Sequence, residues 1–378
     1  MSFKLNLHLD RRNTSFVGRW WWTLDRPTFF AMMALVFTGM FLVAAAGPPV
    51  AERIGLPEFY FVTRHQIFLL LAMVVLFAIS LLPLIQVRRL AGLVLLLSLA
   101  AMLLLPFIGF ENKGAVRWIR FGGMSVQPSE FMKPAFAVIA AWIFTLRFRL
   151  EGFPSFRLAT GLYVLIIGLL ILQPDFGMVV TVSAMFAVQF FLAGMPLRWV
   201  VGMGLAAMFG MIIAYSSFDH VAARIDRFLD PASGDNYQVE TSLKAFTKGG
   251  LIGAGPGEGV VKQRLPDAHT DFIFAVAGEE FGLIFCLMIV ALFAYIVVRG
   301  FLRLSAEEDL FTMLAAAGLL TQFGVQAIVN MGVAVNLLPA KGMTLPFLSY
   351  GGSSLLAVAL GMGMLLALTR KQFGRAKR

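Results

Sequence analysis

The sequence predicts an all-α, polytopic integral membrane protein with about ten transmembrane helices. Hydrophobic residues make up 59% of the chain and charged residues only 14%, against about 25% charged residues in soluble domains. Apolar runs of spanning length recur along the whole chain, and basic residues gather between them. The net charge of +10 therefore indicates a membrane surface rather than nucleic acid. Cys286 is the single cysteine, so no intramolecular disulfide can form.

Each predicted span is an apolar run close to the length of roughly 20 residues that a bilayer requires. The runs are 29–47, 64–85, 88–109, 129–147, 158–173, 176–194, 198–218, 272–299, 310–338 and 352–369. The fifth and sixth are separated only by QPDFG, and merging them would place the termini on opposite sides. We expect a break, because Pro174 and Gly177 flank the charged Asp175.

Basic residues set the expected topology. With the N-terminus in the cytoplasm, more than half of the 31 Lys and Arg fall in cytoplasmic segments, so both termini are predicted to be cytoplasmic. Residues 1–28 form an N-terminal tail, 29–369 the transmembrane domain, and 370–378 a basic tail. The first apolar run ends in LVAAAGPP, which resembles a signal-peptide cleavage site, but the long polar stretch before it favours an uncleaved span.

Two segments on the predicted outer face, 110–128 and 219–271, are too polar to span. A connection as long as the second is usually functional or disordered. Its amphipathic piece VETSLKAF predicts half-helices lying on the membrane. Its glycine-rich run KGGLIGAGPGEG suits a compact loop, and close approach of backbone to sugars or phosphate is the alternative.

The stretch RLPDAHTDFIFAVAGEEFG concentrates titratable groups at the start of the eighth predicted span. Asp271 sits at or beside the helix N-terminus, where a capping role is the simplest interpretation. Glu279 and Glu280 follow about two turns inside, at a depth where a carboxylate lines a polar cavity or finds a cation. Packing against Lys133 or against backbone groups is the alternative for these two acids.

Further charges precede other spans at the same predicted face. Glu130 and Lys133 are three residues apart on one helix face, which also allows a purely local pair. Asp175 lies at an outer helix end, and Arg117 and Lys341 are outward-facing cations. The ninth span carries a polar stripe that serves either a site or interhelical hydrogen bonding; its members are Gln322, Gln326, Asn330 and Asn336. These groups together predict a cavity open to the outer leaflet that binds something both lipidic and anionic.

Four motifs resemble signatures of the SEDS family (shape, elongation, division and sporulation). They are GAVRWIRFGGMSVQPSEFMKP, QPDFG, LPDAHTDFIFAVAGEEFG and LPAKGMTLPFLSYGGSSLL, in the order found in that family. The resemblance covers roughly residues 20–370. The motif AKGMTLPFLSYGGSS is more similar to the division branch of the family than to the elongation branch.

The resemblance implies a ten-helix peptidoglycan glycosyltransferase of the bacterial inner membrane that polymerises lipid II at the division site. It implies a catalytic aspartate in the long outer loop, which matches Asp271, and a class B penicillin-binding protein and other divisome proteins as partners. It also implies dependence on a divalent cation, Mg or Mn, although no metal-ligand cluster is evident in the sequence. Division-type relatives often carry a glutamate where this chain has Gln263, so a role for that glutamate does not transfer.

The resemblance also assigns chemistry to the candidate residues. Asp271 would take the proton of the acceptor sugar hydroxyl, and cations would hold the departing pyrophosphate. Candidate substrate contacts are Arg117, Lys133, Lys341, His269 and Ser353, and the supporting acids are Glu130, Asp175, Glu279 and Glu280. A transporter or flippase for lipid II and a non-catalytic division scaffold are the alternative functions.

Overall fold

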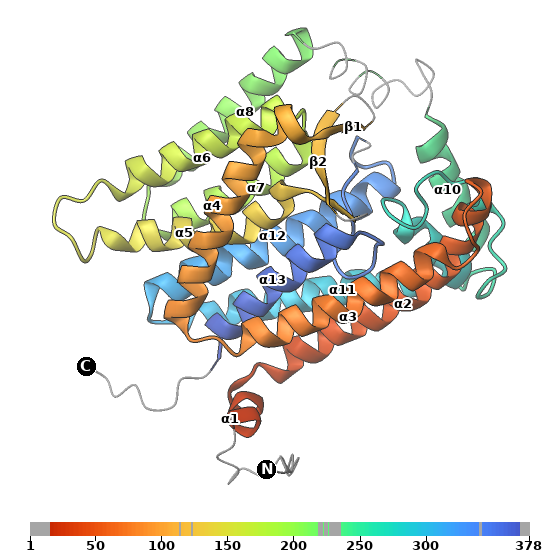
Figure 1. Cartoon of the computed structure of the whole chain (residues 1–378), viewed down its shortest axis with the longest axis horizontal. Helices are drawn as coiled ribbons and strands as arrows, with labels where there is room; N and C mark the ends of the chain where they lie inside the picture. The colour runs from red at the N-terminus through yellow and green to blue at the C-terminus, as the bar shows by residue number, and fades with distance from the viewer. Residues whose placement is uncertain are drawn as a thin grey trace.

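The computed structural model describes residues 16–112, 115–121, 124–217, 222, 226, 236–339 and 342–370. Most of this chain is a bundle of long helices (Figure 1). The helices are α1 Phe16–Thr23, α2 Arg26–Arg53, α3 Tyr60–Ser80, α4 Leu84–Ile108, α5 Pro128–Leu146, α6 Ser155–Leu172, α7 Phe176–Leu192, α8 Leu197–Ser217, α10 Tyr237–Gly249, α11 Ile273–Leu304, α12 Leu310–Ala334 and α13 Gly352–Leu368.

The apolar helices correspond to the predicted spans. Seven helices of the described chain, α2 to α6, α11 and α12, are long and apolar enough to cross a membrane, and α7 and α13 are shorter apolar helices. The predicted break between the fifth and sixth runs is confirmed, because α6 ends at Leu172 and α7 begins at Phe176. Asp175 caps α7 by accepting a hydrogen bond from the backbone N–H of Met178.

Helices α5 and α12 form the centre of the bundle. In the most apolar 18-residue stretch of each, 78% of the residues are buried inside the protein, against 28% for α4, α6 and α11. Small residues allow this packing: a side chain added at Gly318 of α12 would come within 2.4 Å of the Gln189 amide of α7. Gln189 in turn donates hydrogen bonds to Ala137 O and Leu314 O, which join α7 to both central helices. The outer helices expose leucine and phenylalanine, as a lipid-facing surface requires.

Helix α1 and the C-terminal end of α13 lie at the same end of the bundle (Figure 1). Trp20 of α1 donates to Ser80 Oγ at the end of α3 (2.9 Å), and Arg303 at the end of α11 donates to Thr369 O just after α13 (3.0 Å). The sidedness of the termini in the membrane stays a prediction. We call this end of the bundle the terminal end and the opposite one the distal end.

A small antiparallel sheet lies at the distal end, within the segment 110–128 that was predicted not to span. Strands β1 Phe110–Asn112, β2 Ala115–Phe121 and β3 Met124–Val126 pair in the order β1-β2-β3. The signal was present in the sequence: β2 reads AVRWIRF, rich in β-branched and aromatic residues, and Lys-Gly and Gly-Gly dipeptides flank it. Helix α10, at the right of Figure 1, confirms the predicted amphipathic half-helix around VETSLKAF.

Candidate active site

Asp271 lies at the distal end, in the turn that leads into α11. The turn closes with a hydrogen bond from the Asp271 N–H to Asp267 O (3.0 Å), and the residue that immediately precedes α11 is Phe272 rather than Asp271. The Asp271 side chain is half-buried. Its Oδ2 lies 3.2 Å from the position that a Cβ on Gly342 would occupy, so the carboxylate borders the segment before α13.

The polar stripe of α12 holds this turn through hydrogen bonds. The Asn330 amide donates to Asp271 O (2.8 Å) and to Met343 O (2.6 Å), which fixes the two segments on either side of the carboxylate. One turn away, Gln326 donates to Thr344 O (3.1 Å) and accepts from Lys133 Nζ (2.9 Å). Gln326 and Asn330 are four residues apart, about 6 Å along the axis of α12. Their hydrogen bonds therefore link Lys133 and the main chain of Asp271 in one network.

Lys133 and Glu130 form the predicted local pair on α5, with 2.9 Å between Nζ and Oε2. The Lys133 side chain has 0% exposure, so its charge faces Glu130 and Gln326 rather than an open surface. A buried lysine of this kind organises the surrounding polar groups more directly than it contacts a substrate.

Three hydroxyl groups hold the segment that follows Gly342. Ser349 Oγ donates to Thr270 O and accepts from the Leu345 N–H (2.8 Å). The hydroxyls of Thr344 and Ser354 lie 2.6 Å apart. Ser353, the sequence candidate beside Ser354, is buried in the first turn of α13. Lys341 lies outside the described residues.

His269 packs in an aromatic cluster beside Asp271. Its ring centre is 4.1 Å from that of Phe61 and 5.3 Å from that of Tyr350, and its carbonyl accepts from the Tyr350 N–H (2.8 Å). Burial lowers the pKa of His269 to about 4, Asp267 opposes this shift, and Arg53 adds to it. The ring is therefore neutral at physiological pH, with no positive charge to offer a phosphate.

Arg117 and Asp175 meet each other at the turn between α6 and α7. The Arg117 guanidinium donates to Gln173 O (2.8 Å) and Pro174 O and lies 3.7 Å from the Asp175 carboxylate. Gln127, just before α5, donates to the same carboxylate (3.1 Å). These contacts hold the sheet against the helical bundle, and they occupy the guanidinium that the sequence offered as a pyrophosphate contact.

Glu279 and Glu280 do not lie inside a straight spanning helix as the sequence suggested. Gly282 has a φ of 78° and bends α11, so both acids precede the bend and contact the outer loop. Glu279 accepts from three backbone N–H groups, those of Val260, Val261 (both 2.7 Å) and Lys262 (2.8 Å). Glu280 pairs with the Lys262 ammonium. Glu279 therefore packs against backbone groups, and Glu280 pairs with a cation. That cation is Lys262 of the outer loop rather than Lys133.

The glycine-rich run packs against these acids as a compact loop. Ala254 N and Gly255 N donate to the carbonyls of Glu279 (2.9 Å) and Glu280 (3.0 Å). Gly253 has a φ of 85°, and a Cβ there would lie 2.2 Å from Glu280 O, so only glycine fits. Gln263, at the end of the short 3-10 helix Val261–Gln263, accepts a hydrogen bond from Arg53 through its carbonyl (3.4 Å).

Comparison with known proteins places the chain in a family. Residues 26–373 match the sequence profile of the FtsW, RodA and SpoVE cell cycle proteins. The chain belongs to this family. The resemblance to SEDS proteins is thereby confirmed.

Relatives in this family agree over nearly the whole chain. A protein of Caulobacter vibrioides named "Probable peptidoglycan glycosyltransferase FtsW" is 45% identical over 96% of this chain and 94% of its own length. A protein of the same name from Geobacter metallireducens is 34% identical over 99% of both chains.

Solved structures share the architecture. A chain from a structure described as "Structural coordination of polymerization and crosslinking by a peptidoglycan synthase complex" has a TM-score of 0.76 and 28% identity, covering 92% of this chain and 98% of that one. The rod shape determining protein RodA of Thermus thermophilus has a TM-score of 0.69 and 27% identity, covering 93% of this chain and 99% of its own. The chain is thus a multi-pass membrane protein with the fold of this family.

The sequence interpretation missed two arginines near the site. Arg53 reaches the carbonyls of Gln263 and Leu265 (both 3.4 Å), and Arg64 lies over the Tyr60 ring (4.9 Å) and interacts with Tyr350. Both arginines come from the distal ends of α2 and α3, far from the motifs in sequence, so only the fold brings them near His269. In the described part of the chain, no group of three or more His, Cys, Asp or Glu side chains could hold a metal ion.

Proposed function

We propose that this protein is a peptidoglycan glycosyltransferase of the FtsW type, which polymerises lipid II into glycan strands during septal cell-wall synthesis. The observation that carries the proposal is the Asp271 carboxylate, half-buried at the distal end, with its backbone and neighbouring segment held by Asn330. A carboxylate at this end of the spanning helices supports the proposal, because lipid-linked sugars present their head groups at the membrane surface. The protein acts in the inner membrane at the division site.

Asp271 is the proposed general base. It takes the proton of the 4-hydroxyl on the acceptor GlcNAc, and that oxygen attacks the anomeric carbon of the donor. The new glycosidic bond forms as the bond from the anomeric carbon to the undecaprenyl pyrophosphate breaks, and the pyrophosphate leaves with the electron pair. The main chain of Asp271 is fixed by hydrogen bonds. This support suits the step, because it limits where the carboxylate can lie before the substrate arrives.

The departing pyrophosphate requires positive charge. Arg53 and Arg64 supply it at the distal ends of α2 and α3, and Lys341 precedes Gly342, which borders the Asp271 carboxylate. Lys133 acts as a positioning residue: with Glu130 it orients Gln326, which holds Thr344 O. Arg117 fixes the sheet to the α6–α7 turn, where Asp175 is its partner.

The contacts of the buried acids favour a polymerase over a flippase. Glu279, Glu280 and Glu130 each have a close partner that accounts for their burial, so none is needed to gate the passage of a substrate. A class B penicillin-binding protein with one transmembrane helix is the proposed partner, supported by the similarity to a chain of a complex that couples polymerization to crosslinking. Dependence on a divalent cation stays a prediction from the resemblance, and the steps above use only protein side chains.

The decisive experiment is lipid II polymerisation by the purified protein together with its penicillin-binding partner. Asp271→Asn keeps the size and the hydrogen-bonded main chain but removes the base, so glycan synthesis should fall about a thousandfold. Asp267→Asn is the matched control: Asp267 has a φ of 52°, which asparagine tolerates, and its activity should stay within about threefold of wild type. A folded, partner-bound Asp271→Asn protein that makes glycan at the normal rate refutes the proposal.

A further inference from the structure

A polar cavity of about 310 Å³ lies at the terminal end, on the opposite side of the bundle from Asp271. It opens between the start of α2 and the end of α11, two helices of membrane-spanning length. Its lining residues are Trp22, Leu24, Asp25, Arg26, Pro27, Arg299 and Arg303. None of them takes part in the proposed polymerase site.

The cavity carries an excess of positive charge. Among the described residues that line it, Asp25 is the single acid, and it accepts hydrogen bonds from Arg299 (3.1 Å), Arg303 (2.7 Å) and Thr28 (2.6 Å). Arg303 also lines a second cavity that contains acids, so Arg26 and Arg299 against one carboxylate leave a formal charge of about +1, which an anion would balance. The Arg299 and Arg303 side chains keep 35% and 28% exposure, so both are partly accessible.

Arg26 is held in place by aromatic rings rather than by the carboxylate. Its guanidinium carbon lies 4.7 Å from the Trp22 ring centre and 5.7 Å from that of Trp21. Stacking on indole orients the group while leaving its N–H donors available for an oxygen ligand. Tryptophan also marks the level of lipid head groups in membrane proteins, so the cavity sits at the depth of phospholipid phosphates.

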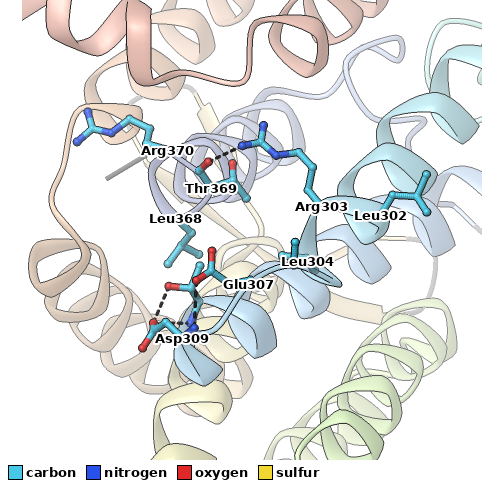
Figure 2. A pocket seen from close by; sticks show the side chains of 10 residues that line it. Leu302, Arg303, Leu304, Glu307, Asp309, Leu368, Thr369 and Arg370 are labelled. Atoms are coloured by element: carbon cyan, nitrogen blue, oxygen red, sulfur yellow. Dashed lines mark hydrogen bonds between the residues drawn. The ribbon is translucent and has the colours of Figure 1, made fainter. Parts of the chain in front are cut away.

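A second cavity at the same end does not have this character. It measures about 530 Å³ and lies among the ends of α11 and α13 and the start of α12 (Figure 2). Arg303 and Arg370 line it, but so do Glu307 and Asp309, which balance their charge. Figure 2 shows Arg303 donating to Thr369 O and the Asp309 carboxylate capping α12, where it accepts from the Thr312 N–H (3.0 Å). An anion is therefore favoured only in the smaller cavity.

We propose that the smaller cavity binds the phosphate of an anionic glycerophospholipid from the leaflet at the terminal end, with Arg26 and Arg299 as its contacts. Clusters of basic residues between helices at a membrane surface recognise such head groups. The same phosphate chemistry would accept a water-soluble phosphodiester, but the cavity borders two spanning helices whose exposed faces are apolar. Acyl chains lying along those faces would add to the affinity.

Lipid binding can be measured on the delipidated full-length protein in a neutral detergent by native mass spectrometry. The probes are short-chain phosphatidylglycerol, short-chain phosphatidylcholine and glycerophosphoglycerol, the head group without chains. Arg26→Gln and Arg299→Gln each remove a charged contact and should weaken phosphatidylglycerol binding about tenfold. Arg89→Gln is the matched control, an exposed arginine in the first turns of α4, and should change binding by less than about twofold.

Arg26→Gln guards against a folding artefact, because Arg26 is not among the groups that bind Asp25. Preference for phosphatidylglycerol over phosphatidylcholine, lost in both cavity variants and kept in Arg89→Gln, supports the proposal. Equal weakening in all three variants, no weakening in Arg26→Gln, or equal binding of phosphatidylcholine overturns it. If glycerophosphoglycerol binds as tightly as the lipid, the lipid assignment is wrong.

Discussion

Two buried glutamate–lysine pairs serve different parts of this protein. Glu130 and Lys133 are three residues apart on α5, whereas Glu280 of α11 pairs with Lys262 of the outer loop. All four side chains are 6% exposed or less. The two pairs differ in the other hydrogen bonds of their lysines. Lys133 donates to Gln326, which contacts an active-site segment, and Lys262 donates to Gly257 O within the loop (3.3 Å).

The comparison teaches that burial of a charge does not identify its role. Both pairs meet the same physical requirement, since a buried ion is tolerated only with an opposite charge and hydrogen bonds around it. Removing one partner leaves an uncompensated charge, whereas replacing both by neutral groups is often close to neutral for stability. Single and double substitutions therefore separate the pair that supports catalysis from the pair that supports the loop.

The largest effect is expected at Lys133. Lys133→Met should lower the free energy of unfolding by about 3–5 kcal/mol, because Glu130 is left buried without its partner. The double variant Glu130→Gln/Lys133→Met should recover most of that stability. It should still polymerise lipid II about a hundredfold more slowly, because Gln326 loses the donor that orients its amide toward Thr344 O.

Thermal unfolding in detergent and lipid II polymerisation measure the two effects separately. Lys133→Arg tests whether charge alone is enough, since its planar guanidinium does not reproduce the ammonium geometry in a fully buried site. A double variant that regains both stability and normal activity would show that the Glu130–Lys133 pair has only a packing role.

The loop pair should respond differently. Lys262→Met and Glu280→Gln should each lower the free energy of unfolding by about 3 kcal/mol and increase protease cleavage within residues 250–263. Lys262→Met/Glu280→Gln should restore both stability and polymerisation, because Glu279 still binds three backbone N–H groups of the loop. A double variant that is stable but inactive would assign this pair to catalysis as well.

The same contrast explains what the sequence could predict. The break at Asp175 follows from local spacing and was predicted correctly, and the local Glu130–Lys133 pair was one of the interpretations that spacing left open. The partners of Glu279 and Glu280 were not predicted, because they lie 17 to 19 residues away in an outer loop that packs against the bend at Gly282. A single glycine inside an apolar run gives no warning of a φ of 78°.

The catalytic assignment shows a different limit. Spacing alone left Asp271 as a possible helix cap, and the resemblance identified it as catalytic. The structure adds Asn330, whose place in a polar stripe was visible but whose acceptors, Asp271 O and Met343 O, belong to segments on both sides of α12 in the chain. Arg53 and Arg64 could not be assigned from spacing, because Gln263 and Tyr350, which they contact, are distant loop residues.

The segment between Lys262 and Asp271 offers a smaller test that depends on pH. Burial lowers the pKa of His269 from 6.5 to about 4, so the folded protein binds fewer protons than the unfolded chain between these values. Stability from this residue is fully present above pH 6.5 and is lost as the pH falls toward 4, by about 2 kcal/mol at pH 5. His269→Phe should make the Tm less sensitive to a change from pH 7.5 to pH 5, and an unchanged sensitivity would contradict the assignment.

The smallest effect is expected at a third glutamate–lysine pair, which calibrates the other two. Glu240 and Lys244 lie four residues apart on α10, with 3.8 Å between charges and side-chain exposures of 57% and 71%. Water screens an ion pair of this kind, so Lys244→Met should change the free energy of unfolding by less than about 0.5 kcal/mol and leave polymerisation unchanged. A loss comparable to that of Lys262→Met would mean that α10 rests against a surface, a membrane or a partner, that the described contacts do not include.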